Sequence, residues 1–585
     1  MKSLKIELKR FEDFGKPKEI FFFLVVLYSG ILGGYLKPLF GITIFFVLCL
    51  ALLFLFLKEM KLNSDSLIYL LFAMFCVLST LWAPNKHSAL LFSQSILAGS
   101  IFYIVLRSNE RLLPKVLTLL IVCGLVHSVF GLIQHSREVP SGLFYNRNPY
   151  AGFLTPLVFL SLYPFLEKNR SICGFFSFFF IFSVFLSGSR GASTSILALF
   201  IILIVYLIVK KDWLSLKRAS IVILCSLFVY IVFLQGKVVL WKSSLHEPTY
   251  IERGFTTDRF EKFRSYPEAL FMSPLIGQGM NSFRVISLTI DCPPLNIWKD
   301  VHAHNLFFNI LLELGAVGFL LFSAFLISVF RMGYQSDTIL SILPLISFFL
   351  PNLFEYNFPA PPFQVLLLTL CASSIKRKAS PFFLNVRIKK ILCLGMVLFF
   401  LISSLFPVFG ITLFNRAIKI AEKDMEAGFK LMLYADSLCW CCANIPLAIA
   451  DMLYQAYDAD RKKGEPLLPL IERYYKKALE RDKGSVEYHI ELAKFYFRTG
   501  RIQDAEAQLL YAQKLFPFST DLKFEMGRFY REKGDYAKSI QFFSELLELY
   551  SKYDIFPELK IRVLEELNMT YKLKGDTDNL RNTKM

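Results

Sequence analysis

One short segment, residues 304–318, combines side chains that can do chemistry with a position beside an apolar run. His304 and Asn305 stand at the start of that run, and Gly315 and Gly318 lie farther along it. An imidazole placed there would lie where water meets a membrane, and it can exchange a proton near neutral pH. The two glycines would let a neighbouring helix approach closely. The alternative interpretation is a histidine that only caps a helix.

A metal site is a competing interpretation of the same region. His302 and His304, together with Asp291 and Cys292, provide two imidazoles, a carboxylate and a thiol. Their spacing does not match a recognised zinc pattern, so no metal ion is expected. The sequence has neither a Walker loop nor a dinucleotide fingerprint, so no cofactor is expected either.

The elements that must position these residues are apolar helices. The chain has 585 residues, of which 55% are hydrophobic and 62 are phenylalanine. Repeated uncharged runs of about 20 residues exclude an ordinary soluble enzyme. We therefore predict an all-α, polytopic membrane protein with about 12–13 spans. The predicted spans are residues 20–35, 39–57, 66–82, 89–106, 112–134, 149–166, 171–187, 193–209, 219–235, 305–330, 338–354, 362–375 and 391–414.

Positive charges indicate how these spans are oriented. The formal net charge is +18, which suits a membrane protein better than a nucleic-acid binder, because lysine and arginine collect in cytoplasmic loops. Alternate loops, such as residues 376–390, are rich in these side chains. The pattern places residues 1–19 in the cytoplasm and the long loop 236–303, within the membrane domain 20–414, on the outer side. An odd number of spans would place the tail, residues 415–585, on the outer side as well.

The tail has the composition of a soluble, helix-rich domain with an internal repeat. Similar residues recur after 34 positions, as at Tyr496 and Tyr530 or Gly500 and Gly534. This spacing resembles that of tetratricopeptide repeats, whose small residues let paired helices pack closely. Such arrays bind proteins or peptides on their concave face, so a protein partner is expected. The repeat positions are Ala493, Tyr496, Gly500, Ala505, Leu509, Ala512 and Pro517, followed by Gly527, Tyr530, Gly534, Ser539 and Phe543.

Four cysteines lie outside the predicted spans. They are Cys292, Cys439, Cys441 and Cys442. An oxidising compartment would permit a disulfide among them, but the sequence does not define the pairing.

The segment that begins at His304 resembles the signature of the O-antigen ligase family. That signature is His, then Asn, Ser or Gln, nine further residues, Gly, two residues, and finally Gly, Thr or Val. Residues 304–318 match every specified position. Residues 187–192, which include Arg190, resemble the Ser-Arg-Gly element of the same family.

Two further outer segments extend the resemblance. Residues 142–152 resemble the family's Asn-x-Asn loop through Asn146 and Asn148. Residues 257–283 resemble a loop in which an arginine, here Arg259, precedes an aromatic residue and a glycine-rich turn. The glycines of that turn are Gly277 and Gly279, and Phe263 stands where the family usually has tryptophan. Together the similar blocks cover roughly residues 140–360.

The resemblance implies a glycosyltransferase that needs no nucleotide sugar. Its donor would be a glycan carried on undecaprenyl diphosphate. Its acceptor would be lipid A–core, a protein or a growing polysaccharide, and the family resemblance does not separate these three. Such an enzyme lies among the lipids of the bacterial inner membrane, with its active site and repeat domain facing the periplasm.

The resemblance also implies roles for individual residues. Arg190 and Arg259 would hold the donor diphosphate, because a guanidinium group forms a planar fork that matches phosphate oxygens. Arg264 could replace Arg259. His304 would be either the general base for the acceptor hydroxyl or another phosphate ligand. Fixed guanidinium charge would stabilise the leaving diphosphate, so the reaction would be independent of metal ions.

Two other function classes are compatible with the composition. A flippase for lipid-linked sugars would place charged or broken helices at the bilayer midplane and repeat its spans internally, whereas the polar residues here concentrate on the outer side. A scaffold that acts through its repeats would leave Arg190, Arg259 and His304 without a role.

Overall fold

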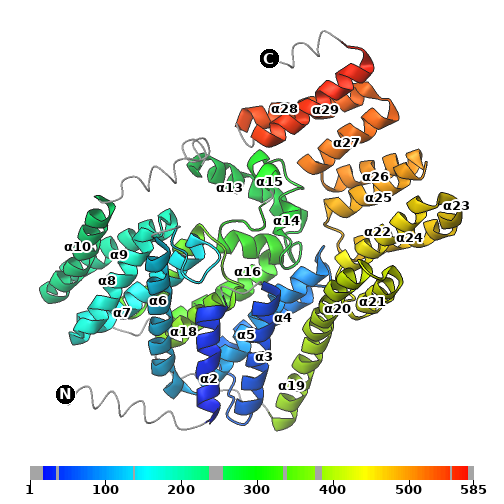
Figure 1. The fold of residues 1–585 in the computed structure, drawn as a ribbon. Coiled ribbons are helices and arrows are strands. Elements are labelled where there is room, and N and C mark those ends of the chain that lie inside the picture. The colour runs from blue at the N-terminus through cyan, green and yellow to red at the C-terminus, as the bar shows by residue number, and fades with distance from the viewer. Residues whose placement is uncertain are drawn as a thin grey trace. The chain divides into compact units, whose positions relative to one another are not determined.

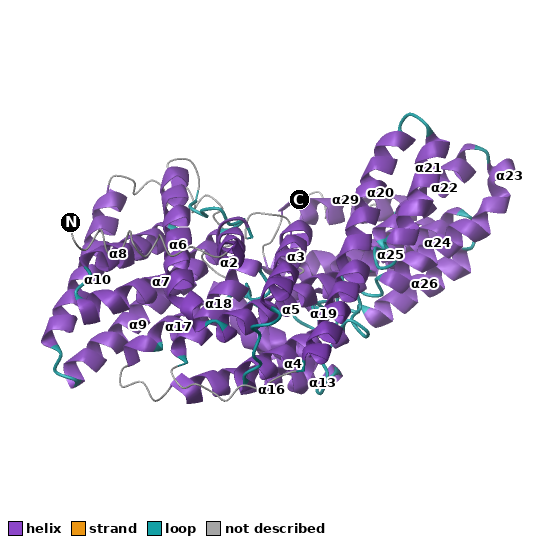
Figure 2. Ribbon diagram, turned by 90° about the horizontal axis from the view of Figure 1, so that it is seen from below, coloured by secondary structure: helices purple, strands orange, loops and turns teal. Residues whose placement is uncertain are grey.

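The structure is a computed structural model (Figure 1). It describes residues 17–33, 38–135, 139–235, 255–298, 300–333, 339–375, 385–553 and 557–576. Every regular element within these residues is a helix, as Figure 2 shows. The predicted all-α fold is therefore confirmed.

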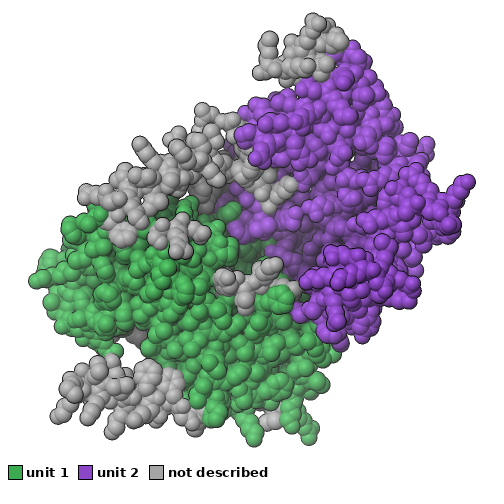
Figure 3. Space-filling view, in the orientation of Figure 1, with its two compact units in different colours: residues 1–80, 89–238, 303–405 green, residues 81–88, 239–302, 406–585 purple. Residues whose placement is uncertain are grey.

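The chain forms two compact units, coloured separately in Figure 3. The first unit comprises residues 1–80, 89–238 and 303–405, and the second comprises residues 81–88, 239–302 and 406–585. This division differs from the predicted one, which kept loop 236–303 and all residues up to 414 in the membrane domain. The described part of the loop belongs with the repeats because its side chains pack there. Val285 Cγ2, for example, lies only 2.4 Å from the position that a Cβ on Gly484 would take.

The first unit consists of apolar helices that cover the predicted spans within a few residues. Most of these helices are apolar around their circumference, as suits helices that face lipid as well as protein. The elements are α2 (Pro17–Leu27), η1 (Tyr28–Leu32), α3 (Pro38–Phe56), α4 (Ser64–Ser79), α5 (Lys86–Ser108), η2 (Glu110–Leu112), α6 (Leu113–His135), α7 (Arg147–Lys168), α8 (Ser171–Leu186), α9 (Arg190–Val209), α10 (Trp213–Gln235), α16 (Leu306–Gly333), η3 (Ile339–Ser341), α17 (Leu343–Phe349), η4 (Pro351–Leu353), α18 (Pro361–Ser374), α19 (Val386–Phe400) and η5 (Leu401–Leu405).

Seven helical stretches among the described residues are long and apolar enough to cross a membrane. Five shorter apolar helices accompany them. The predicted count of about 12–13 spans is larger because it included these shorter helices and α2. By length and composition, the chain is a polytopic membrane protein. The seven stretches are Lys86–Ser108, Glu110–His135, Arg147–Lys168, Arg190–Val209, Trp213–Val232, Leu306–Gly333 and Arg387–Ala421.

Helices α4 and α16 run antiparallel through the first unit. The ring of Phe72 lies 5.3 Å from that of Phe322, and the ring of Tyr69, one turn earlier in α4, lies 4.7 Å from that of Phe325, one turn later in α16. Helix α16 therefore begins at the end of the bundle where α4 finishes. The start of α4 marks the opposite end.

Charged side chains are paired at the end where α4 begins. Arg107 Nε donates a hydrogen bond to Asp65 Oδ2 at 3.0 Å, and both side chains are almost fully buried. Glu19 pairs there with Arg111 at 3.1 Å and with Lys115 at 3.8 Å. We call this region the paired end of the first unit. The opposite region, where α7, α9 and α16 begin, is called the histidine end.

The second unit is built from helix pairs that match the predicted repeat. The ring of Phe543 lies 2.7 Å from the position of a Cβ on Gly527, so a larger residue there would push α27 and α28 apart. The repeat residues Ala505, Leu509 and Ala512 are buried. Its elements are α13 (Phe255–Met272), α14 (Phe283–Ile286), α15 (Pro293–Trp298), α20 (Phe406–Ala421), α21 (Met425–Leu438), α22 (Asn444–Ala459), α23 (Arg461–Gly464), η6 (Glu465–Leu467), α24 (Leu468–Arg481), α25 (Val486–Arg498), α26 (Ile502–Leu515), α27 (Thr520–Lys533), α28 (Tyr536–Tyr553) and α29 (Pro557–Lys574).

Candidate functional site

Asn305 fixes the start of α16 and so the position of His304. Its side-chain oxygen accepts hydrogen bonds from the backbone N–H groups of Phe307 and Phe308 at 2.9 and 3.0 Å, which caps the helix. Its Nδ2 donates to the carbonyl of Leu353 at 3.0 Å. His304 itself has φ of 49°, in the left-handed region that few non-glycine residues adopt. The backbone thus holds the imidazole in an unusual conformation, a common feature of functional sites.

A carboxylate, Glu355, lies beside this imidazole. Its Oε2 is 3.9 Å from His304 Nδ1, and both side chains are partly buried. Its Oε1 accepts a hydrogen bond of 2.6 Å from Asn148 Nδ2. Asn146 caps the same helix, α7, by accepting a hydrogen bond of 3.2 Å from the backbone N–H of Asn148. The amide of the predicted Asn-x-Asn loop therefore holds the carboxylate that faces the histidine.

The start of α9 approaches the same place. Arg190 is the first residue of α9 and is exposed. A Cβ on the next residue, Gly191, would lie 3.5 Å from Phe354 Cβ, and one on Gly188 would lie 3.8 Å from Arg147 Nη1. The segment 351–357 therefore contacts the start of α9 through Phe354, α16 through Leu353 and α7 through Glu355. Three helix N-termini, with their partial positive charge, converge on this segment.

Gly315 acts differently from the close helix approach that the sequence suggested, whereas Gly318 does lie close to a neighbouring helix. Gly315 has φ of 63° and ψ of −167°, which interrupts the helical path of α16. Only glycine adopts this conformation without strain. A Cβ on Gly318 would lie 2.3 Å from Leu314 Cβ and 3.3 Å from the ring of Phe75 on α4. The missing side chain at Gly318 thus leaves space both for Leu314 of the same helix and for Phe75 of α4.

The remaining predicted residues lie in the second unit. Arg259 and Arg264 belong to α13. Arg264 is exposed, while the side chain of Arg259 lies outside the described part of the structure. Gly277 and Gly279 have φ of 68° and 97°, as the glycine-rich turn requires. A Cβ on Gly279 would lie 2.5 Å from Ala83 Cα, so the turn packs directly on the backbone of residues 81–88.

Sequence reasoning missed two residues of the histidine end. Glu355 is a single acidic residue between two apolar runs, 338–354 and 362–375, and that isolation was the available signal. The second residue is Arg147, which lies between Asn146 and Asn148.

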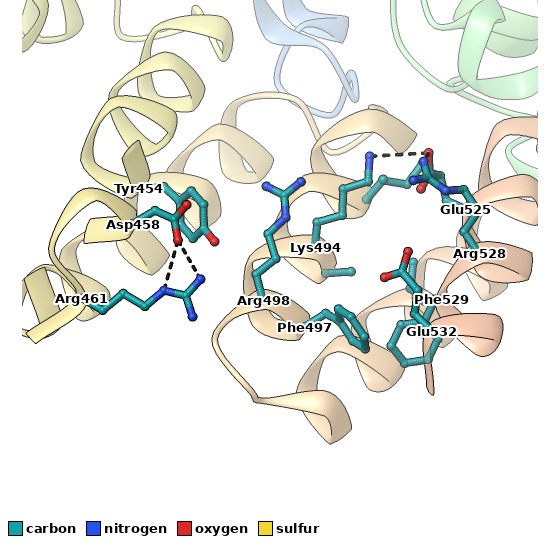
Figure 4. A pocket seen from close by; sticks show the side chains of 13 residues that line it. Tyr454, Asp458, Arg461, Lys494, Phe497, Arg498, Glu525, Arg528, Phe529 and Glu532 are labelled. Carbon is teal, nitrogen blue, oxygen red and sulfur yellow. Dashed lines mark hydrogen bonds and ion pairs between the residues drawn. The ribbon is translucent and has the colours of Figure 1, made fainter. Parts of the chain in front are cut away.

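The second unit carries a separate groove of about 750 Å³ on its repeat helices (Figure 4). Charged side chains line it, and several are already paired: Arg461 Nη2 lies 2.8 Å from Asp458 Oδ1, and Lys494 Nζ lies 3.5 Å from Glu525 Oε1. The guanidinium of Arg498 lies 5.7 Å from the ring centroid of Tyr454. A binding partner in this groove would therefore contact both charged and aromatic side chains.

Two families of known proteins match parts of the chain. Residues 175–323 match the family described as O-antigen ligase, a range that includes Arg190 and His304. This part of the chain is called the O-antigen ligase domain because of that similarity. Residues 472–520 and 490–554 match the tetratricopeptide repeat family, so the ligase domain is followed by such repeats. No curated protein matches the chain in sequence.

Solved structures resemble the chain only distantly. A human IFIT1 dimer with PPP-AAAA is 11% identical, with 90% of this chain and 94% of that chain covered and a TM-score of 0.23. Yeast Tom70 is 11% identical, with 85% and 87% covered and a TM-score of 0.22. TM-scores this low carry no argument about the fold or the function of the O-antigen ligase domain.

Proposed function

We propose that the O-antigen ligase domain transfers a preassembled glycan from undecaprenyl diphosphate to an acceptor hydroxyl at its histidine end. The observation that carries this proposal is the meeting of three helix N-termini at the segment 351–357. The partial positive charge of a helix start suits a phosphate group. Exposed Arg190 and partly buried His304 add a fixed positive charge and a group that can move a proton.

In the proposed reaction, the acceptor oxygen attacks the anomeric carbon of the glycan. The bond between that carbon and the diphosphate breaks, and undecaprenyl diphosphate leaves with the electron pair. Arg190 would stabilise the charge that develops on the diphosphate, because a guanidinium cannot lose its proton. Arg259, or Arg264 in its place, would supply a second guanidinium from α13.

His304 would accept the proton of the acceptor hydroxyl. Glu355 supports this role, because a carboxylate near an imidazole stabilises the imidazolium that forms when the proton arrives. Asn148 would keep Glu355 directed at the imidazole through its 2.6 Å hydrogen bond. The alternative role, in which His304 only binds phosphate, predicts that donor binding itself depends on His304.

The proposed orientation follows from loop charge. The histidine end and the repeats would face the periplasm of a bacterial inner membrane, and the paired end would face the cytoplasm. Reporter fusions near residues 245 and 480 would test this topology. A reporter that is active in the cytoplasm at either position would contradict it.

The deciding experiment is reconstitution of the full chain in lipid vesicles. Undecaprenyl diphosphate carrying a labelled glycan would be supplied with lipid A–core, a hydroxyl-bearing protein or a free polysaccharide, and products would be identified by mass. Transfer is expected to one of these acceptors and to persist with a chelator. Loss of transfer on chelation, with rescue by one ion, would contradict the metal-independent chemistry. Movement of intact donor across the bilayer without bond cleavage would support a flippase.

A further inference from the structure

A cluster of metal-ligating side chains lies in the second unit. His87 stands in the first turn of α5, and a short turn, residues 439–442, joins α21 to α22. We call this turn the cysteine turn, because it contains Cys439, Cys441 and Cys442. All three cysteines are buried, with at most 2% of their surface exposed. The cluster therefore offers three sulfur atoms and one imidazole nitrogen within the protein interior.

The imidazole of His87 lies near two of the sulfurs at distances close to those around a tetrahedral ion. His87 Nδ1 lies 3.5 Å from Cys441 Sγ and 4.0 Å from Cys442 Sγ. These three atoms all lie within 4.8 Å of one another, and Cys439 Sγ is bonded to Cys442 Sγ. Around a tetrahedral zinc ion with Zn–S of about 2.3 Å and Zn–N of about 2.0 Å, a sulfur and a nitrogen ligand are separated by roughly 3.6 Å.

The backbone around the cysteine turn is held firmly. A Cβ on Gly410 of α20 would lie 2.8 Å from Cys439 Cβ, so the turn packs directly against that helix. Arg481 Nη1 donates a hydrogen bond of 2.9 Å to the carbonyl of Cys442. The amide of Cys442 donates to the carbonyl of Cys439 at 3.2 Å. Such outer contacts orient metal ligands in known sites.

Charge near the cluster also favours a cation held by thiolates. Three thiolates, one neutral imidazole and one divalent ion together carry a charge of −1. Arg481 and Lys477 both contact Asp436, at 2.5 and 2.6 Å. These three side chains carry a net charge of +1, and they lie beside the cysteine turn through the bond from Arg481 to Cys442. The surroundings would therefore neutralise the loaded site.

We propose that His87 and the three thiols of the cysteine turn bind one thiophilic divalent cation of the Zn²⁺ type. Three sulfurs and one imidazole nitrogen make a closed ligand set, which is typical of structural rather than catalytic zinc. The ion would join residues 81–88 to the loop between α21 and α22. This proposal does not depend on the glycan-transfer reaction.

The disulfide between Cys439 and Cys442 and the metal site exclude each other. A thiol or phosphine reductant supplies two electrons, and two protons complete the two free thiols. Binding of the cation to Cys439, Cys441 and Cys442 then releases three protons, because the ligands are thiolates. The disulfide-bonded chain keeps only Cys441 and His87 as ligands and should bind the ion weakly.

The test uses the full chain purified in detergent and reduced with a phosphine. Titration with Co²⁺, a spectroscopic substitute for Zn²⁺, should give one equivalent with the intense visible bands of tetrahedral thiolate coordination. Cys441→Ser and His87→Asn should each weaken binding by at least about 100-fold, because even changes to outer contacts cost about 10–100-fold. Cys292→Ser, which removes a buried cysteine outside the cluster, should leave binding unchanged.

X-ray absorption of the wild-type chain loaded with Zn²⁺ avoids any dependence on variant folding. Three sulfur neighbours at about 2.3 Å and one nitrogen at about 2.0 Å would support the site. Coordination by oxygen and nitrogen alone would overturn the proposal, and so would Co²⁺ binding that survives Cys441→Ser or an absence of binding to the reduced chain. Glycan transfer is measured separately, so failure of one proposal leaves the other intact.

Discussion

The two ends of the first unit use similar charged residues in opposite ways. At the paired end, Arg107 and Asp65 are almost fully buried and bonded to each other, and Tyr103 adds a hydrogen bond of 2.7 Å to Asp65. At the histidine end, Arg190 is exposed, and the side chains of His304 and Glu355 are 24% and 17% exposed. A buried, satisfied pair can stabilise the fold but has no capacity left for a ligand. The proposed reaction therefore uses the more accessible charges of the histidine end.

The largest expected effect is at the histidine end. His304→Ala should lower glycan transfer by about 10²–10⁴-fold if the imidazole is the general base. The amount of folded protein in the membrane should not change. Transfer assays with lipid-linked donor, together with donor-binding measurements, check this. A variant that keeps most of its activity would remove His304 from the mechanism, and a variant that no longer binds donor would make it a phosphate ligand.

The second-largest effect is expected at the buried ion pair of Arg107 and Asp65, at the paired end. Arg107→Ala leaves Asp65 buried without its cation, which should destabilise the first unit by about 3–5 kcal/mol. Thermal unfolding in detergent measures this loss, while transfer per folded molecule should stay near that of the wild type. The matched control is Arg111→Ala, whose exposed side chain pairs with Glu19 and should contribute about 1 kcal/mol or less. Equal losses for both variants would refute the distinction between buried and exposed pairs.

A smaller effect is expected when the positive charge at position 190 is kept but the planar guanidinium group is lost. Arg190→Lys should reduce transfer by roughly 10- to 100-fold, because one charge-assisted hydrogen bond, worth about 1.5–3 kcal/mol, is lost. The control, outside the histidine end, is Arg218→Lys, since Arg218 donates to the carbonyl of Leu166 at 2.8 Å and lies 5.9 Å from the ring centroid of Phe165. Transfer by that control should fall by no more than about twofold. If Arg190→Lys behaves like the control, Arg190 does not form a two-pronged contact with the donor.

The smallest expected effects are changes in stability when either of two glycines is replaced by alanine. Gly315→Ala forces a side chain into a conformation that glycine alone tolerates, and should cost about 1–3 kcal/mol of stability. Gly395→Ala lies inside α19, where a Cβ would meet no atom within 4 Å, and should raise stability by roughly 0.5–1 kcal/mol. Unfolding temperatures of the two variants should therefore shift in opposite directions. Equal shifts would show that the break in α16 has no energetic importance.

The sequence predicted the helices well because hydrophobic runs are a local property. Each predicted span of the first unit has helical structure, and the repeat residues Ala505 and Phe543 are buried as expected. Contacts between segments that lie far apart in the sequence cannot be predicted from local hydrophobic runs. The pairing of Glu355 with His304, and the packing of loop residue Val285 on the repeats, depend on contacts between residues far apart in the chain. The motif includes Gly315, but the backbone break there depends on φ and ψ values that no sequence pattern supplies.

The break at Gly315 has a consequence for the depth of the site in a bilayer. Residues 316–333 extend roughly 27 Å at about 1.5 Å per residue, close to a hydrocarbon thickness of about 30 Å. If residues 316–333 span the bilayer, the short helical stretch before the break, Leu306–Leu314, would lie at headgroup depth with His304 at its start. Under the proposed function, hydrophobic mismatch would then act on the site directly, since a thicker bilayer would submerge this stretch and a thinner one would lift it away from lipid-borne substrates. The acyl-chain length of the host lipid would then control access to the histidine.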